Sequence, residues 1–144
     1  MRIGKVYNWI KNNQRSRCLL CLTVGRYGDR HLCDACQTDL PWLASACPVC
    51  ALPMPLDGQV CGKCQAHRPA FAQVVTPFRY GFPLDSLIPA FKHHSQLAYG
   101  RMLARLMSEA IIYHYQDRGQ ALPDCVIAMP LHRRRLAERG FNQD

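Results

Sequence analysis

The sequence predicts a small metal-stabilised β module followed by an incomplete α/β domain. Eight of the nine cysteines stand in Cys-x-x-Cys pairs within residues 18–64, which predicts the metal-stabilised module. A helical pattern over residues 97–118 and a short apolar run at residues 124–129 predict the α/β part. The composition changes at residues 65–69, so the predicted divisions are residues 1–17, 18–66 and 70–144.

Length and composition restrict the class of protein. A chain of 144 residues holds one ordinary domain, or one small domain beside part of another. With 49% hydrophobic and 19% charged residues, the chain is globular and not disordered. No apolar run approaches the ~18 residues of a membrane span and no signal peptide is recognisable, so we expect a cytoplasmic protein. The formal charge of +8 falls to about +4 once eight thiolates and two zinc ions are counted.

Residues 1–17 are basic and contain no acid. Ile3, Val6, Tyr7 and Ile10 share one stripe, which predicts a basic N-terminal helix or arm. Three interpretations compete: a helix docked on the body of the protein, a peripheral membrane helix, and an arm for nucleic acid. A helix of so few turns is marginal on its own, which favours the docked or frayed helix.

The cysteine pairs are the strongest signal in the chain. A two-residue gap lets a tight turn direct both sulfurs to one metal ion, and two such turns complete a tetrahedral site. A closed site of this kind has no open position for a substrate, so it is structural. The four pairs therefore predict two structural zinc sites, with the ligands Cys18, Cys21, Cys33, Cys36, Cys47, Cys50, Cys61 and Cys64.

The cysteine array also repeats itself. Cys18 and Cys47 are 29 residues apart, and Cys33 and Cys61 are 28 residues apart. A repeat of this length favours two ribbons in series, in which the first four cysteines hold one ion and the last four hold the other. The alternative is an interleaved arrangement, in which the first and third pairs share an ion, as do the second and fourth.

Other interpretations of these residues are less favoured. A disulfide framework is less favoured because disulfides do not persist in the reducing compartment expected for this chain. Zinc is preferred over rubredoxin-like iron because a structural site needs no redox chemistry. His31 and His67 are expected to be exposed bystanders, since eight cysteines complete both sites. Lys63 and Arg68 are expected to offset the negative charge of the second site. Cys125 is expected to be a small buried side chain.

The segments after the first ribbon predict packing residues and short strands. Leu40, Trp42 and Leu43 are expected to pack the two ribbons together, because a ribbon has almost no core of its own. Residues 71–83 are rich in aromatic and branched side chains and predict one or two short strands. Pro77 limits their pairing to an edge or a bulge.

Two helices are predicted next. Asp85 is the expected N-cap of the first, which tolerates Pro89 only near its first turn and ends at residues 92–94. The second covers residues 97–118 and stops at Gly119. Its inward face is predicted to contain Leu103, Leu106, Met107, Ala110, Ile111 and His114.

The last segment combines a buried strand with a basic loop. Residues 124–129 form a continuous apolar run, as in a strand buried on both faces of a parallel sheet. Ligands bind open α/β sheets at the carboxyl ends of the strands, and cations there suit a multiply charged phosphate or a nucleic-acid backbone. The structural alternative is a solubilising charged loop. The cations that follow the run are His132, Arg133, Arg134, Arg135 and Arg139.

These features together resemble the ComF (ComFC) family of bacterial competence proteins, and most closely its DNA-utilisation branch, GntX. The motifs are the double four-cysteine ribbon, the strand–helix segment and Met-Pro-Leu-His-Arg-Arg-Arg-Leu-Ala-Glu-Arg-Gly-Phe-Asn-Gln, within about residues 18–143. The resemblance implies a zinc ribbon fused to a type I phosphoribosyltransferase fold, and the handling of single-stranded DNA. It also implies that the cations of residues 132–139 face phosphates, and that Gly140, Phe141 and Asn142 shape the loop.

One part of that family's pattern is absent. Its phosphoribosyltransferase fold needs paired acids for the ribose hydroxyls and a Thr-Gly turn for the 5′-phosphate, and this chain contains no Asp-Asp, Asp-Glu or Thr-Gly sequence. We therefore expect a fragment of a longer protein or a truncated gene. A single strand without neighbours cannot satisfy its backbone amides, so residues 70–144 are expected to expose apolar surface and to be unstable or oligomeric alone.

Three functions are consistent with these observations. The first is a zinc-binding accessory protein of DNA uptake or utilisation, which binds single-stranded DNA or a phosphoribosyl phosphate and has partners in the uptake machinery. The second is a phosphoribosyltransferase that uses Mg²⁺-bound phosphoribosyl pyrophosphate, and it requires a continuation with the absent motifs. The third is a ribbon-mediated protein–protein adaptor, in which the basic loop is only a solvated rim.

Overall fold

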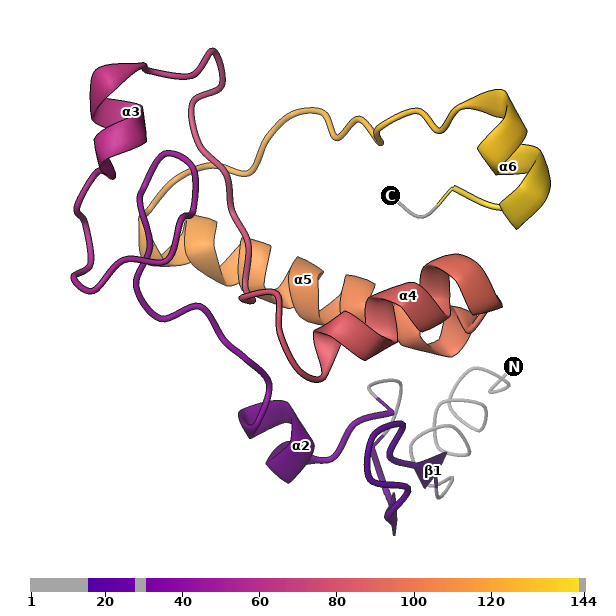
Figure 1. Ribbon diagram of the computed structural model, residues 1–144. Helices are drawn as coiled ribbons and strands as arrows, with labels where there is room; N and C mark the ends of the chain where they lie inside the picture. The colour runs from indigo at the N-terminus through magenta and orange to yellow at the C-terminus, as the bar shows by residue number, and fades with distance from the viewer. Residues whose placement is uncertain (1–15, 28–30, 143–144) are drawn as a thin grey trace, which may run out of the picture.

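The computed structural model describes residues 16–27 and 31–142. The helix or arm predicted over residues 1–17 lies outside the described residues, except for its last two, which form a strand. In chain order the elements are β1 (Ser16–Arg17), β2 (Val24–Gly25), α2 (Asp34–Thr38), α3 (Gly62–Ala66), α4 (Leu84–His94), α5 (Leu97–Asp117) and α6 (Arg133–Arg139). In Figure 1, α2 lies below the α4–α5 pair and α6 lies above it. No described helix is long and apolar enough to cross a bilayer.

The first metal module is built from β1, β2 and α2. The two short strands pair antiparallel, with Ser16 opposite Gly25 and Arg17 opposite Val24. Cys18 follows β1 directly, and Cys33 is the N-cap of α2. β1 therefore ends, and α2 begins, at a predicted metal ligand, and β2 pairs with β1.

The second metal module repeats this plan with less strand pairing. Cys61 is the N-cap of α3, as Cys33 is of α2. An isolated antiparallel bridge between Ala46 and Pro53 takes the place of the β1–β2 pair. Pro53 has no backbone N–H, so the pairing cannot extend into a regular ladder.

The hydrophobic core joins the first metal module to the helix pair. A ribbon buries little apolar area, and packing on helices gives it a larger core. The buried side chains of this cluster are Cys18, Leu32, Leu40, Leu84, Leu87, Met102 and Leu106.

The expectation that residues 40–43 pack the two ribbons together is wrong. Leu40 belongs to the core formed with α4 and α5, and that core contains no residue of the second metal module among the described residues. Trp42 packs on Phe78, with the ring centroids 4.6 Å apart. Figure 1 accordingly shows α2 and α3 well separated. The helices offer more apolar surface than a second ribbon does, which explains the preference.

α4 and α5 form a close antiparallel pair. A Cβ on Gly100 would clash with the Phe91 ring, so a larger residue at this position would require the ring to move. α4 differs from expectation at its start, because Pro83 is the N-cap and Asp85 lies in the first turn. Pro89 stands well inside α4 and not near its first turn.

α5 confirms the predicted helix over residues 97–118 to within one residue. Gly119 follows it with φ 59°, the left-handed conformation that ends a helix. The predicted inward face is confirmed in part: Leu106 is buried and Leu103 packs against the core, whereas Met107 is 47% exposed. Met102, which the prediction omits, is also buried in the core shared with α4 and the first module.

The predicted strands of residues 71–83 do not form. Phe78 makes only an isolated antiparallel bridge with Trp42. The backbone N–H of Leu43 donates to the carbonyl of Pro77 at 2.8 Å, and that of Arg79 donates to Pro41 at 2.9 Å. Proline at positions 41 and 77 removes the donors that a longer ladder would need.

The buried strand predicted at residues 124–129 is also absent from this structure. Val126 and Ile127 are 87% and 86% exposed, and Cys125 is exposed instead of buried. The apolar run has no neighbouring strand within the described ranges, so no strand covers its faces or pairs with its backbone. The run therefore exposes apolar surface, while the expected behaviour of residues 70–144 alone stays a prediction.

Candidate metal centres and nucleic-acid interface

Two groups of four cysteines lie close enough together to bind one metal ion each. Within each group all four sulfur atoms lie within 4.8 Å of one another. The first group contains Cys18, Cys21, Cys33 and Cys36, and the second contains Cys47, Cys50, Cys61 and Cys64. The cysteines are therefore grouped in series, as the repeat predicts, and the interleaved alternative is wrong.

The sulfur positions fit a zinc ion. Zinc–thiolate bonds of about 2.3 Å in a tetrahedron place neighbouring sulfurs about 3.8 Å apart. The sulfurs of Cys21 and Cys33 are 3.7 Å apart, and those of Cys50 and Cys61 are 3.6 Å apart. These separations exceed the ~2.05 Å of a disulfide bond, and all nine cysteines are free thiols. Zinc bound there would link the two turns of each module and supply no reactive position.

The backbone turns that present the sulfurs are the same in both modules. The N–H of Leu22 donates to the carbonyl of Cys18 at 2.9 Å, and the N–H of Ala51 donates to that of Cys47 at 2.9 Å. Leu22 and Ala51 both adopt the left-handed conformation, with φ of 62° and 57°. The repeat seen in the cysteine spacing is therefore a repeat of local structure.

Backbone N–H groups also point at the sulfur atoms. The N–H of Cys33 lies 3.5 Å from the sulfur of Cys18, and the N–H of Cys61 lies 3.4 Å from that of Cys47. In the first module, Cys36 donates its N–H to the sulfur of Cys33 at 3.4 Å. These donors offset part of the negative charge that four thiolates bring to each site.

The thiols of each group differ in acidity before an ion binds. A hydrogen bond with the Thr23 hydroxyl, 3.2 Å away, lowers the pKa of Cys21 to about 6. The N–H of Cys61 lowers the pKa of Cys47 to about 6. Burial raises the pKa of Cys64 to about 12 and also raises the pKa of Cys36. Each group thus contains at least one thiol with a lowered pKa and one with a raised pKa, whose proton must be released when metal binds.

The histidines near the sites are not ligands in this arrangement. His31 and His67 are both exposed, and neither belongs to a metal-binding group of the described residues. Lys63, predicted to offset the charge of the second site, lies in α3 between two of its ligands and is exposed. Arg68 is exposed just after α3.

The basic segment predicted as a loop forms a helix instead. The His132 side chain caps the start of α6, accepting the backbone N–H of Arg134 at its Nδ1 atom at 3.3 Å. Gly140 ends α6 in the left-handed conformation, with φ 75°, and its N–H donates to the carbonyl of Leu136 at 2.8 Å. A side-chain cap at one end and a glycine at the other are sufficient to define a short helix.

Two contacts fasten this segment to the rest of the protein. The side-chain amide of Asn142 donates to the carbonyl of Met129 at 3.0 Å, which joins the two ends of the segment. The Phe141 ring packs on Phe91 of α4, with the centroids 5.3 Å apart. Asn142 and Phe141, two of the residues named from the family resemblance, therefore hold α6 in place.

The arginines of α6 face solvent. Arg133, Arg134 and Arg135 are all exposed, while Arg139 is half-buried one turn after Arg135. Arg134 forms an ion pair with Glu138 at 3.0 Å, but the two side chains are 83% and 59% exposed. An ion pair so exposed is worth less than about 1 kcal/mol, so a bound phosphate can compete with it.

The sequence did not indicate a cleft that has a volume of about 750 Å³. Residues 76–80, α4, α5 and the apolar run 126–129 line it, and Arg79 and Lys92 supply its cations. None of the α6 arginines belongs to this lining, so the structure does not bring the predicted phosphate-binding cations into the cleft. The cleft depends on contacts between distant segments, for which the sequence carries no local signal.

Comparison with known proteins relates these features to a family. Residues 15–65 match the family model described as a double zinc ribbon domain. The DNA utilization protein YhgH of Shigella flexneri is 33% identical over 129 residues, which are 88% of this chain and 56% of the relative. The protein of the same name from Escherichia coli strain K12 is 32% identical over the same shares. Competence protein F of Haemophilus influenzae is 31% identical over 127 residues, 88% of this chain and 55% of the relative.

Two further facts delimit the comparison. The chain spans just over half the length of these relatives. No solved structure matches the chain significantly. The cysteine groups, the zinc-ribbon match and the similarity over most of this chain agree with the motifs read from the sequence. The chain is therefore homologous over most of its length to DNA utilization protein YhgH and competence protein F, and its cysteine-rich part matches a double zinc ribbon.

Proposed function

We propose that this protein acts in DNA uptake or utilisation by binding the phosphates of single-stranded DNA through α6. One observation carries the proposal: three consecutive exposed arginines stand on a helix that is capped at both ends and held to α4 by the Phe141 ring. Guanidinium groups bind phosphate oxygens in pairs, which suits a strand of repeated phosphates. The name of the relative DNA utilization protein YhgH agrees with a role in handling DNA.

The fastening of α6 favours binding energetically. A disordered basic loop would lose conformational entropy when it contacts a ligand, at about 1–2 kcal/mol for each residue ordered. α6 is already ordered by the His132 cap, the Gly140 stop and the Asn142 hydrogen bond. The arginines therefore lose mainly side-chain freedom on binding.

Exposed aromatic rings supply a second contact for single-stranded DNA. Tyr80 is 72% exposed and lines the same cleft as Met129, the residue to which Asn142 fastens the α6 segment. Bases stack on such rings without regard to sequence. Phosphate contacts at α6 and stacking at Tyr80 would together give binding that tolerates any sequence.

The metal modules have a structural part in this proposal. Leu32 and Leu40 of the first module pack on α4 and α5, and Phe141 fastens the α6 segment to α4. A zinc ion in the first site would fix the turns from which Leu32 and Leu40 project. The metal thus supports the position of α6 and does not contact DNA directly.

The decisive experiment compares two sets of three arginine substitutions in the full chain. Changing Arg133, Arg134 and Arg135 to alanine should weaken binding of a labelled single-stranded oligonucleotide at least about tenfold. It should also reduce the slope of log affinity against log salt by about 2, since each phosphate contact contributes about 0.7. The control changes Arg101, Arg105 and Arg118 on and after α5, which removes the same charge elsewhere.

Competition distinguishes DNA from a phosphoribosyl ligand. Phosphoribosyl pyrophosphate with Mg²⁺ carries similar charged groups, so it displaces the oligonucleotide if α6 binds phosphates of that kind better. Displacement at low concentration would assign α6 to the phosphoribosyl ligand instead. If the α6 variant and the control variant bind the oligonucleotide with equal affinity, α6 binds neither DNA nor a phosphoribosyl ligand. That result would favour a protein–protein adaptor that uses the exposed Leu52, Leu56 and Phe71.

A further inference from the structure

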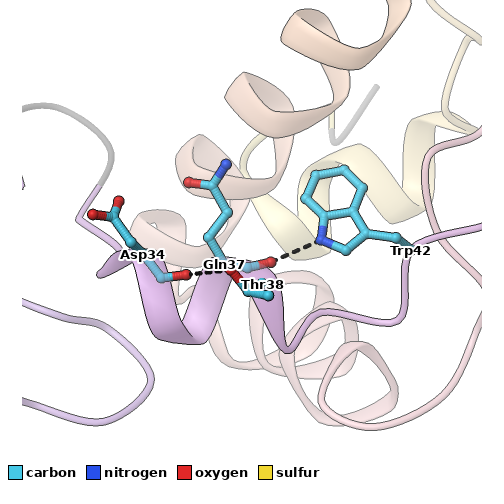
Figure 2. A pocket seen from close by; sticks show the side chains of 4 residues that line it. All are labelled: Asp34, Gln37, Thr38 and Trp42. Carbon is cyan, nitrogen blue, oxygen red and sulfur yellow. Dashed lines mark hydrogen bonds between the residues drawn. The ribbon is translucent and has the colours of Figure 1, made fainter.

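We propose that a pocket beside α2 holds one base of the bound strand, with the base stacked on Trp42. This inference rests on the proposed binding of single-stranded DNA and adds a further contact, far from α6. The pocket has a volume of about 430 Å³ and is lined by Asp34, Gln37, Thr38 and Trp42. A pocket of this size accommodates a nucleoside. Figure 2 shows the indole ring at one end of the pocket and the Asp34 carboxylate at the other.

The indole ring is fixed before any ligand binds. Its Nε1–H donates to the backbone carbonyl of Gln37 at 2.8 Å. One neighbour of the ring is Phe78, at 4.6 Å between centroids with an interplanar angle of 43°. Trp42 and Phe78 are opposite each other in an isolated antiparallel bridge, where side chains approach closely. The ring is nevertheless 36% exposed, so part of its surface remains available for stacking.

The polar groups of the pocket favour a ligand that donates hydrogen bonds. Asp34 and Gln37 are three residues apart on α2, so their side chains lie on one face, as Figure 2 shows. The Asp34 carboxylate can only accept hydrogen bonds. The Thr38 hydroxyl already donates to the Asp34 carbonyl at 2.9 Å, which leaves it as an acceptor.

Gln37 contributes an unsatisfied acceptor. Its Oε1 atom is shielded from solvent and has no hydrogen-bond partner among the described residues. An unpaired acceptor of this kind costs roughly 1–3 kcal/mol. Because Gln37 also lines the pocket, rotation of its side chain can turn the amide toward a bound group that donates.

A base with an exocyclic amino group matches these features. Cytosine, adenine and guanine each carry an amino group that donates to carboxylate or amide oxygens, and their rings stack on indole. Thymine donates only through its N3–H, and the carbonyl oxygens on either side of that group would face the acceptors of the pocket. The pocket therefore predicts a preference for these bases over thymine, added to the sequence-independent phosphate contacts of α6.

The preference for cytosine tests this assignment in the full chain. We expect oligo(dC) of about 15 nucleotides to bind about tenfold more tightly than oligo(dT) of equal length. Asp34→Asn should bring the two affinities within about twofold of each other. Asp57→Asn removes the same charge from an exposed position in the second module and should leave the preference unchanged. Zinc content measured on each variant confirms that its metal sites are intact.

Fluorescence gives an independent readout of stacking. The chain has two tryptophans, so the Trp9→Phe variant reports on Trp42 alone. Oligo(dC) should quench its emission, and Asp34→Asn should reduce the quenching. If DNA binds through α6 while Trp42 emission and the dC-to-dT ratio stay unaffected, the pocket is not a base site and the proposed function stands. If no oligonucleotide binds at all, both proposals are wrong.

Discussion

At the scale of single residues, the metal sites depend on two backbone conformations that side chains resist. Leu22 and Ala51 occupy the fourth position after the first cysteine of each module, with φ of 62° and 57°. Non-glycine residues pay roughly 1–2 kcal/mol for the left-handed conformation. The turn is retained because it directs both sulfurs of the pair to one point, and zinc binding offsets its cost.

This strain gives a prediction about Ala51. Ala51→Gly removes the steric penalty of the left-handed conformation and should stabilise the zinc-loaded protein by up to about 1 kcal/mol, since glycine also adds freedom to the unfolded chain. Thermal unfolding with excess zinc measures the effect. Ala44→Gly, at an exposed position outside the left-handed region, is the matched control and should be neutral or destabilising. A loss of stability in Ala51→Gly, equal to that of the control, would contradict this interpretation.

At the scale of elements, sequence reasoning succeeded where the signal is local and failed where it depends on distant partners. The ligand cysteines and the end of α5 at Gly119 are set by chemistry within a few residues, and both were predicted. The run 124–129 looks like a buried strand, but burial requires neighbours that the described residues do not contain. α6 was missed because its caps, His132 and Gly140, stand in a stretch dominated by charge.

The Gly140 cap can be tested directly. Alanine at φ 75° is strained, so Gly140→Ala should weaken α6 by roughly 1 kcal/mol and accelerate amide hydrogen exchange in residues 136–140 about fivefold. No atom lies within 4 Å of the added Cβ, so the effect would be conformational and not a clash. Gly81→Ala, equally open and without a positive φ, is the control. Unchanged exchange in Gly140→Ala would mean that α6 does not depend on this cap.

At the scale of the whole molecule, the two metal modules have different neighbours. The first shares its core with α4 and α5, whereas the second contributes no residue to that cluster. The segment that follows α2 leads away from the first module to the second. The sequence did not indicate that the modules have different neighbours, because both carry similar apolar residues. The candidate DNA contacts are also divided, with the Trp42 pocket beside α2 and the arginines on α6 lying on opposite sides of the helix pair in Figure 1. The fold thus rests on two separate four-cysteine sites.

Zinc content per chain in two double variants tests this claim most directly. Cys21→Ser with Cys36→Ser removes two ligands of one site, so the protein should retain one zinc ion. Cys21→Ser with Cys50→Ser removes one ligand from each site and should leave no tightly bound zinc. The interleaved arrangement predicts the opposite, no zinc in the first variant and one in the second. That reversed result, or a wild-type protein that folds without metal under reducing conditions, would contradict the account.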